Sequence, residues 1–201
     1  MNAATPGVAS SNSFTGTPST VKLIVPAGSK DAYQNADYWK VFTNIEETSA
    51  LNDGDTFEAT VGETTFKVKV LSTADKTCQI GADKTGANGS MVGSDAIVSG
   101  SRNWDGVIPS KVTGSDGQEY TVIGIGNRAF KEYCSITTVI LPNTLQYISE
   151  GAFMRMESLM YFTIPAGLKT VGGLLFNGQE ILTEVVSMIE DPDVINDIYI
   201  A

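Results

Sequence analysis

A segment of this chain repeats itself at a fixed spacing of 23 residues. The stretch IGNRAFKEYCSITTVILPNTLQ, residues 125–146, is followed by ISEGAFMRMESLMYFTIPAGLK, residues 148–169. Five columns keep the period: Phe130, Phe153 and Phe176; Pro142 and Pro165; Ile125, Ile148 and Val171; Ile136, Leu159 and Leu182; and Val139, Phe162 and Val185. A fixed period in the twenties is typical of solenoids, so the sequence predicts a stack of coils.

The columns also indicate how each coil is built. Val139 and Leu141 lie two residues apart, as do Phe162 and Ile164. Alternate residues of a strand point to the same side, so each pair predicts a short strand with these side chains inward. Proline then ends the strand because it has no N–H to donate. Stacking would place the strands in a parallel sheet and the phenylalanines in one continuous column.

The residues beside these inward pairs face solvent and are the predicted ligand-binding positions. They are Thr138, Ile140, Tyr161, Thr163, Glu184 and Val186. Ile140, Tyr161 and Val186 would be unusual as residues that only contact water. The curved sheet face of a solenoid is a common binding surface, so we expect ligands there.

The composition excludes several classes of function. The 201 residues include 13 Lys and Arg against 23 Asp and Glu, a formal net charge of −10, and no histidine. Such a surface repels phosphate groups, so neither nucleic acid nor anionic lipid is an expected partner. The lack of histidine excludes His-based triads and His-ligated metal sites. Cys78 and Cys134 are too few for a four-thiolate zinc site and are expected to be free, half-buried thiols.

Other candidate chemistry is better explained by the repeat or by loops. GIGNRA, residues 124–129, has the form of a dinucleotide fingerprint, but the same register recurs 23 residues later as YISEGA. Carboxylates in residues 83–95 suit calcium, although they lack the ordered spacing of an EF-hand. No apolar run approaches the ~18 residues of a membrane span. We therefore expect no enzyme, with no catalytic residue, no metal, no cofactor and no membrane span.

The pattern divides the chain into four parts. Residues 1–20, rich in Ser, Thr, Gly, Pro and Asn, are expected to be a flexible lead. Residues 21–47 predict a strand and a short helix. Residues 48–106 predict a β-rich cap and a loop, with a hairpin turn at Gly62 and Glu63. Residues 107–201 hold the coils.

The helix in the second part has both a start signal and an aromatic face. Ser29 is the expected N-cap, and Asp31 suits the positive end of the helix. Tyr33, Trp39 and Phe42 are expected to pack together over an open core. Grouped Trp and Tyr side chains also occur in carbohydrate readers, but packing is the favoured interpretation here.

These motifs resemble the BspA-type leucine-rich repeats of surface proteins from Bacteroides-like bacteria. IGNRAF, ISEGAF, VILPNTL and FTIPAGL match the family pattern IGxxAFxxCxxLxxVxIP. The cysteine column of the family falls on Tyr133, Met156 and Gln179, so Cys134 lies one residue late. The resemblance implies a mainly β fold with short helices, of the α/β leucine-rich repeat class: a parallel-sheet solenoid of 23-residue repeats with a β-rich N-terminal cap. It also implies an extracellular or cell-surface location, although the sequence shows no export signal.

The order of the segments is unusual for that family. Residues 21–47 resemble the segment that closes such arrays, yet they precede the segment that resembles the opening one. Two explanations remain open: the chain is an excerpt of a longer tandem array, or Val21–Pro26 supplies a final strand to another copy. Leu23, Val25 and Pro26 have the spacing of the inward pair and the proline of a coil. Because unpaired edges recruit strands, the second explanation predicts a head-to-tail or strand-swapped self-association.

The predicted function is a non-enzymatic binding or adhesion module outside a bacterial cell. The repeat supplies the sheet face, and the resemblance supplies the location and the adhesive role. We expect the ligand to be a protein, or else a glycan. The alternative is a structural spacer or stalk within a larger surface protein, which a uniformly polar sheet face would favour.

Overall fold

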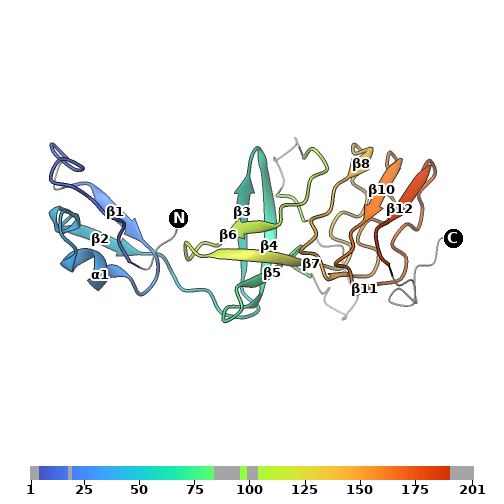
Figure 1. Cartoon of the computed structure of the whole chain (residues 1–201). Helices are drawn as coiled ribbons and strands as arrows, with labels where there is room; N and C mark the ends of the chain where they lie inside the picture. The colour runs from blue at the N-terminus through green and yellow to red at the C-terminus, as the bar shows by residue number, and fades with distance from the viewer. Residues whose placement is uncertain (1–4, 18–19, 84–95, 99–103, 191–201) are drawn as a thin grey trace, which may run out of the picture. The chain divides into compact units, whose positions relative to one another are not determined.

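The computed structural model describes residues 5–17, 20–83, 96–98 and 104–190 (Figure 1). The chain separates into two compact units. The first contains residues 1–51 together with 113–119, and the second contains residues 52–112 and 120–201.

The first unit contains one strand–helix–strand coil. Strand β1 (Lys22–Val25) is followed by helix α1 (Lys30–Asn35), the 3-10 helix η1 (Trp39–Val41) and strand β2 (Asn44–Glu47). Strands β1 and β2 are parallel neighbours. Since parallel neighbours need a crossover, α1 and η1 form the return path between them.

The core of this unit is small and aromatic. Val25, Tyr33 and Ile45 are buried, and Trp39 and Phe42 pack against them, which confirms the expected aromatic packing. The ring centroids of Tyr33 and Trp39 are 5.0 Å apart. Phe14, from the segment expected to be a flexible lead, lies 4.8 Å from Trp39 and 5.0 Å from Phe42.

Ser29 occupies the N-cap position of α1, but its hydroxyl does not cap the helix. The side chain is buried, and its Oγ donates a hydrogen bond to the carbonyl oxygen of Pro26. The Glu47 carboxylate instead accepts a hydrogen bond from the Lys30 backbone N–H at 2.6 Å. A residue distant in the sequence therefore satisfies this free helical donor.

The β-rich cap begins the second unit. Strands β3 (Thr56–Val61) and β4 (Thr64–Ser72) form the hairpin expected around Gly62 and Glu63, with Val61 opposite Thr64. Gly62 has φ of +61°, the left-handed region that glycine adopts readily. Strand β5 (Thr77–Ile80) pairs antiparallel with β4.

The cap joins the coils through one continuous sheet. Strand β7 (Glu119–Ile125) pairs with β6 (Lys111–Thr113) and lies parallel to β5. Strands β9 (Tyr147–Ile148) and β11 (Thr170–Val171) extend the parallel part. The apolar column of Ile125, Ile148 and Val171 is thus a ladder of short parallel strands, a feature that the repeat pattern alone did not predict.

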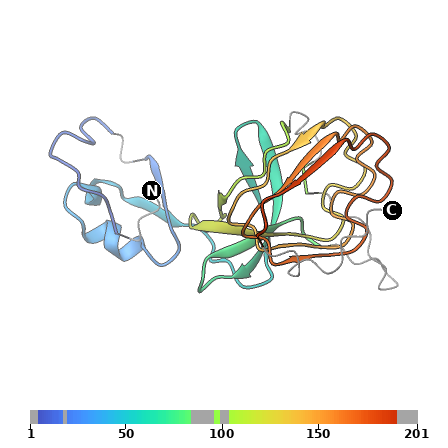
Figure 2. The same cartoon turned by 45° about the vertical axis from the view of Figure 1, so that its right-hand side comes forward.

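The coils form a second, three-stranded parallel sheet from β8 (Thr138–Val139), β10 (Tyr161–Ile164) and β12 (Glu184–Ser187). Tyr161 pairs with Thr138 on one side and with Glu184 on the other, at the expected 23-residue spacing. Successive coils run alongside one another in both views (Figures 1 and 2). The predicted solenoid of 23-residue repeats is confirmed.

The aromatic column inside the coils differs from the expected one. Phe130 and Phe153 stack with centroids 5.4 Å apart and planes at 6°. The next contacts then run from Phe153 to Phe162 at 5.1 Å and from Phe162 to Phe176 at 4.9 Å. A sheet residue thus intervenes between the second and third phenylalanines. Trp104 extends the other end of the stack, 4.5 Å from Phe130.

The return path of each coil has a hydrogen-bond ladder of its own. The backbone N–H groups of Arg128, Phe130 and Glu132 donate to the carbonyls of Glu150, Ala152 and Met154, at 3.0, 2.8 and 2.9 Å. The Ala-Phe motif therefore stacks through its backbone as well as its side chains. Such bonds satisfy polar groups that the coil would otherwise bury unpaired.

Candidate functional site

The structure places all six predicted positions on one exposed face of the three-stranded sheet. Thr138, Thr163 and Glu184 are exposed and polar, whereas Ile140, Tyr161 and Val186 are apolar or aromatic with exposures of 55%, 43% and 39%. We call these six residues the sheet face. Their inward neighbours Val139, Phe162 and Ile164 are buried, because strand side chains alternate between the two faces.

The sheet face continues toward the cap through Val107. This residue forms a parallel bridge with Ile140, and the Ile140 N–H donates to the Gly106 carbonyl at 2.9 Å. Val107 itself is 39% exposed. The apolar surface that begins at Ile140 therefore extends beyond the repeated strands.

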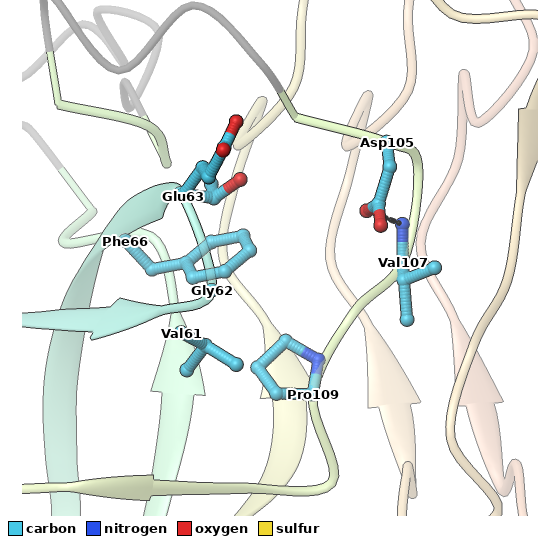
Figure 3. Close-up of a pocket in the computed structure, with 8 residues that line it drawn as sticks. Val61, Gly62, Glu63, Phe66, Asp105, Val107 and Pro109 are labelled. Carbon is cyan, nitrogen blue, oxygen red and sulfur yellow. Dashed lines mark hydrogen bonds between the residues drawn. The ribbon is translucent and has the colours of Figure 1, made fainter.

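A pocket of about 450 Å³ adjoins Val107 in the second unit (Figure 3). It lies between the β3–β4 hairpin and the segment before β6, and its lining residues are Val61, Gly62, Glu63, Thr64, Phe66, Asp105, Val107 and Pro109. Val61, Phe66 and Pro109 supply apolar walls, while Glu63 and Asp105 lie on opposite sides of the pocket in Figure 3. The pocket combines an apolar interior with negative charge.

Two hydrogen bonds hold the pocket wall that carries Val107. The Trp104 indole N–H donates to the Val107 carbonyl at 2.9 Å, and Asp105 Oδ1 accepts from the Val107 N–H at 3.1 Å. The Trp104 ring in turn stacks on Phe130 inside the coils. The pocket could not be predicted from the sequence, because its walls come from segments about forty residues apart with no shared motif. The one local signal was the predicted hairpin turn at Gly62 and Glu63.

The carboxylates considered for calcium do not form a site in the part that the structure describes. Residues 84–95 lie outside the described residues. Asp83 accepts hydrogen bonds from Gln79 at 2.7 Å and the Asn127 N–H at 3.0 Å, and it forms an ion pair with Lys69 at 3.2 Å. Within the described ranges, no group of three or more His, Cys, Asp or Glu side chains is placed to hold a metal ion.

The two cysteines are free, as expected, but neither is half-buried. Cys78 is fully buried in β5, where loss of hydration raises the pKa of its thiol to about 12. Cys134 is exposed on a return path, where its thiol lies 3.2 Å from the Glu132 carbonyl. A thiol with a raised pKa is a poor nucleophile, so Cys78 has the character of a core residue.

Tyr147 links the coils to the cap. Its hydroxyl donates to Gln79 Oε1 at 2.6 Å, and Gln79 Nε2 donates to Asp83. Burial, and secondarily the charge of Asp83, raises the pKa of Tyr147 above its ordinary value. The tyrosine therefore stays a neutral hydrogen-bond donor, and the network has a structural role.

No helix in the described ranges combines the length and the apolar composition that crossing a bilayer requires.

Comparison with known proteins identifies the repeat. Residues 119–196 match the family described as BspA type Leucine rich repeat region (6 copies). The sequence matches no curated protein.

Three solved structures are similar to the chain. A leucine rich cell surface protein from Faecalibacterium prausnitzii A2-165 is 24% identical over 72% of this chain and 33% of that one, with a TM-score of 0.46. The pneumococcal vaccine antigen PcpA is 17% identical over 68% and 39%, with a TM-score of 0.46. A leucine-rich repeat protein from Bacteroides capillosus ATCC 29799 is 27% identical over 65% and 97%, with a TM-score of 0.40. The match spans 33% and 39% of the first two proteins. The repeated part of the chain, residues 119–196, is therefore similar to BspA-type leucine-rich repeats.

Proposed function

We propose that this chain is a non-enzymatic binding module of a bacterial cell-surface protein and that it captures a protein ligand. The sheet face and the adjoining pocket together form the binding surface. The observation that carries the proposal is the exposed apolar surface that runs from Ile140 through Val107 into the pocket. Exposed apolar patches of this kind mark interaction sites.

The chemistry of the surface favours a peptide segment of a protein as the ligand. Val61, Phe66 and Pro109 offer an apolar cavity for one side chain. Glu63 and Asp105 add acidic side chains to its lining, in a chain with a formal net charge of −10. An apolar anchor next to a Lys or Arg would complement both features. A glycan is the second candidate, and Tyr161 supplies the aromatic side chain on which a sugar could stack.

The experiment selects ligands from a random-peptide display library on the immobilised chain. We expect the selected peptides to combine an apolar residue with a nearby Lys or Arg. The double variant Tyr161→Asp with Ile140→Asp should lose capture of these peptides. Both side chains are exposed, so the melting temperature should change little.

Lys131→Asp, a charge change on the return path, is the matched control and should keep full capture. Retention of binding by the double variant would show that the site lies elsewhere. If the chain selects no peptide but binds sugars on a glycan array, the ligand is a glycan and not a protein.

The alternative function is a structural spacer. The polar residues Thr138, Thr163 and Glu184 on the sheet face favour it. A spacer would select no peptide and no glycan above background. Self-association through Val21–Pro26 is a separate proposal, because it concerns the edges of the sheets.

A further inference from the structure

We propose that copies of this chain associate head to tail, with β12 of one copy pairing in parallel with β1 of the next. Among the described residues, β12 ends the three-stranded sheet and β1 ends the two-stranded sheet. Each copy therefore carries two strand edges whose N–H and C=O groups can pair with a further strand. This inference does not depend on the ligand of the sheet face.

The first unit has the geometry of one more coil. Its strands pair in parallel over four residues, from Lys22 with Asn44 onward, as β10 and β12 do. The same backbone hydrogen bond follows the last residue pair of the β1–β2 ladder and of the β10–β12 ladder. The Thr48 N–H donates to the Val25 carbonyl at 2.9 Å, and the Met188 N–H donates to the Ile164 carbonyl at 2.9 Å. Placing β1 after β12 therefore continues the stack in the same direction.

Among the described residues, the burial of β12 and β1 is that of strands with a neighbour on one side only. In β10, which has strands on both sides, Phe162 and Ile164 are both buried. In β12 the corresponding Val185 is only half-buried, and so is Leu23 of β1. Pairing the two edges would place these apolar side chains in contact and cover both of them.

The outward residues of the two edges are complementary in the same register. With Leu23 opposite Val185, Lys22 lies opposite Glu184, and Ile24 lies opposite Val186. Ile24 is 63% exposed and Val186 is 39% exposed, so the pair would cover apolar surface. Opposite charges and apolar pairs across strands are both stabilising.

Proline at the end of β1 fits this arrangement. Pro26 follows Val25 as Pro165 follows Ile164, and β10 with its proline pairs with β8 without difficulty. The missing N–H at this position is therefore compatible with an inner coil. Because the two edges are different surfaces, association is heterologous and produces open chains of copies.

Charge reversal tests the register of the contact. Glu184→Lys would face Lys22 of the next copy. The second variant, Lys22→Glu with Glu46→Lys, keeps the internal ion pair, which measures 2.8 Å, but reverses its direction. Each variant alone puts like charges together, whereas a mixture of the two restores opposite charges at every contact.

We expect sedimentation velocity of the unmodified chain to show open-ended growth with concentration. Each variant alone should raise the dissociation constant by about fivefold at low salt, and the mixture should recover it. Glu157→Lys, an exposed charge change on the return path, should have no effect. A chain that stays monomeric at millimolar concentration, or variants that associate like the parent, would overturn the proposal.

Cross-linking then identifies the edges directly. Neighbouring strands lie about 4.8 Å apart, which suits a disulfide between facing residues. In a Cys134→Ser background, Ile24→Cys with Val186→Cys should give a ladder of covalent oligomers on oxidation. Ile24→Cys with Ile140→Cys is the mismatched control and should give none. A cross-link formed only within single chains would refute association between copies.

Discussion

At the scale of single residues, Cys78 makes a pH-dependent contribution to stability. Its thiol is fully buried, and burial raises its pKa from the ordinary 9.0 to about 12. In the unfolded chain the same thiol ionises near pH 9. Between these values the unfolded state has lost a proton that the folded state retains.

We therefore expect the free energy of unfolding to be unaffected by Cys78 below pH 9 and to fall as the pH rises toward 12. The slope due to this one thiol should approach about 1.4 kcal/mol per pH unit. Urea unfolding at a series of pH values measures it. Cys78→Ala should reduce the slope, whereas Cys134→Ala, at an exposed position, should not. Equal slopes in both variants would show that Cys78 ionises freely in the fold.

The inward and outward residues of the coils could be predicted from the sequence, because the period of two within a strand and the period of 23 between coils fix them together. The residues with a left-handed backbone conformation could not be predicted from the sequence. Arg128, Gly151 and Leu174 form a column with φ of +49°, +59° and +60°. Glycine, the usual sign of this conformation, is present at only one of the three positions. The stack imposes the same backbone on all three coils, so local preference gives too little signal.

At the scale of elements, the two glycines of the GIGNRA motif allow side chains to approach the backbone. A Cβ on Gly124 would lie 2.0 Å from Tyr147 Cζ, and a Cβ on Gly126 would lie 2.8 Å from Asp83 Oδ1 and from Gln79 Nε2. The motif thus accommodates the polar network that joins β5 and β9. This placement explains the glycines without a dinucleotide.

Gly124→Ala should therefore destabilise the fold by displacing the Tyr147 ring and weakening its 2.6 Å bond to Gln79. We expect a loss of about 1–3 kcal/mol in urea unfolding, the usual cost of overpacking. In a Tyr147→Ala background the same substitution should cost much less, because the obstructing ring is absent. Gly173→Ala, where nothing lies within 4 Å of the new Cβ, is the control and should be nearly neutral. Equal losses at both glycines would contradict this account.

The sheet of β8, β10 and β12 could be predicted because the inward apolar residues Val139, Phe162 and Val185 recur every 23 residues, and proline follows two of the three strands. The ladder formed by β9 and β11 could not be predicted from the sequence. Each is two residues long and contributes one buried aliphatic residue, so it has no alternation to detect. The pocket beside Val107 also escaped prediction, since it depends on how the β3–β4 hairpin meets a segment far along the chain.

At the scale of the whole molecule, the two units have separate cores of very different size. The first is built on Val25, Tyr33 and Ile45, with aromatic rings around them. The second contains the cap, the aromatic stack and the inward columns of the coils. Small cores bury too little apolar surface to be very stable, so the first unit should unfold at a lower denaturant concentration.

The two tryptophans of the chain allow this difference to be measured, because Trp39 lies in the first unit and Trp104 in the second. In Trp104→Phe the fluorescence reports on Trp39, and a phenylalanine can still stack on Phe130. In Trp39→Phe it reports on Trp104. We expect the Trp39 signal to change at a lower urea midpoint and with a smaller slope, since the first unit exposes less surface on unfolding. Coincident midpoints and slopes would mean that the units unfold as one cooperative body. In that case the first unit could not unfold while the coils stay intact, and its edge strand would be as stable as the coils.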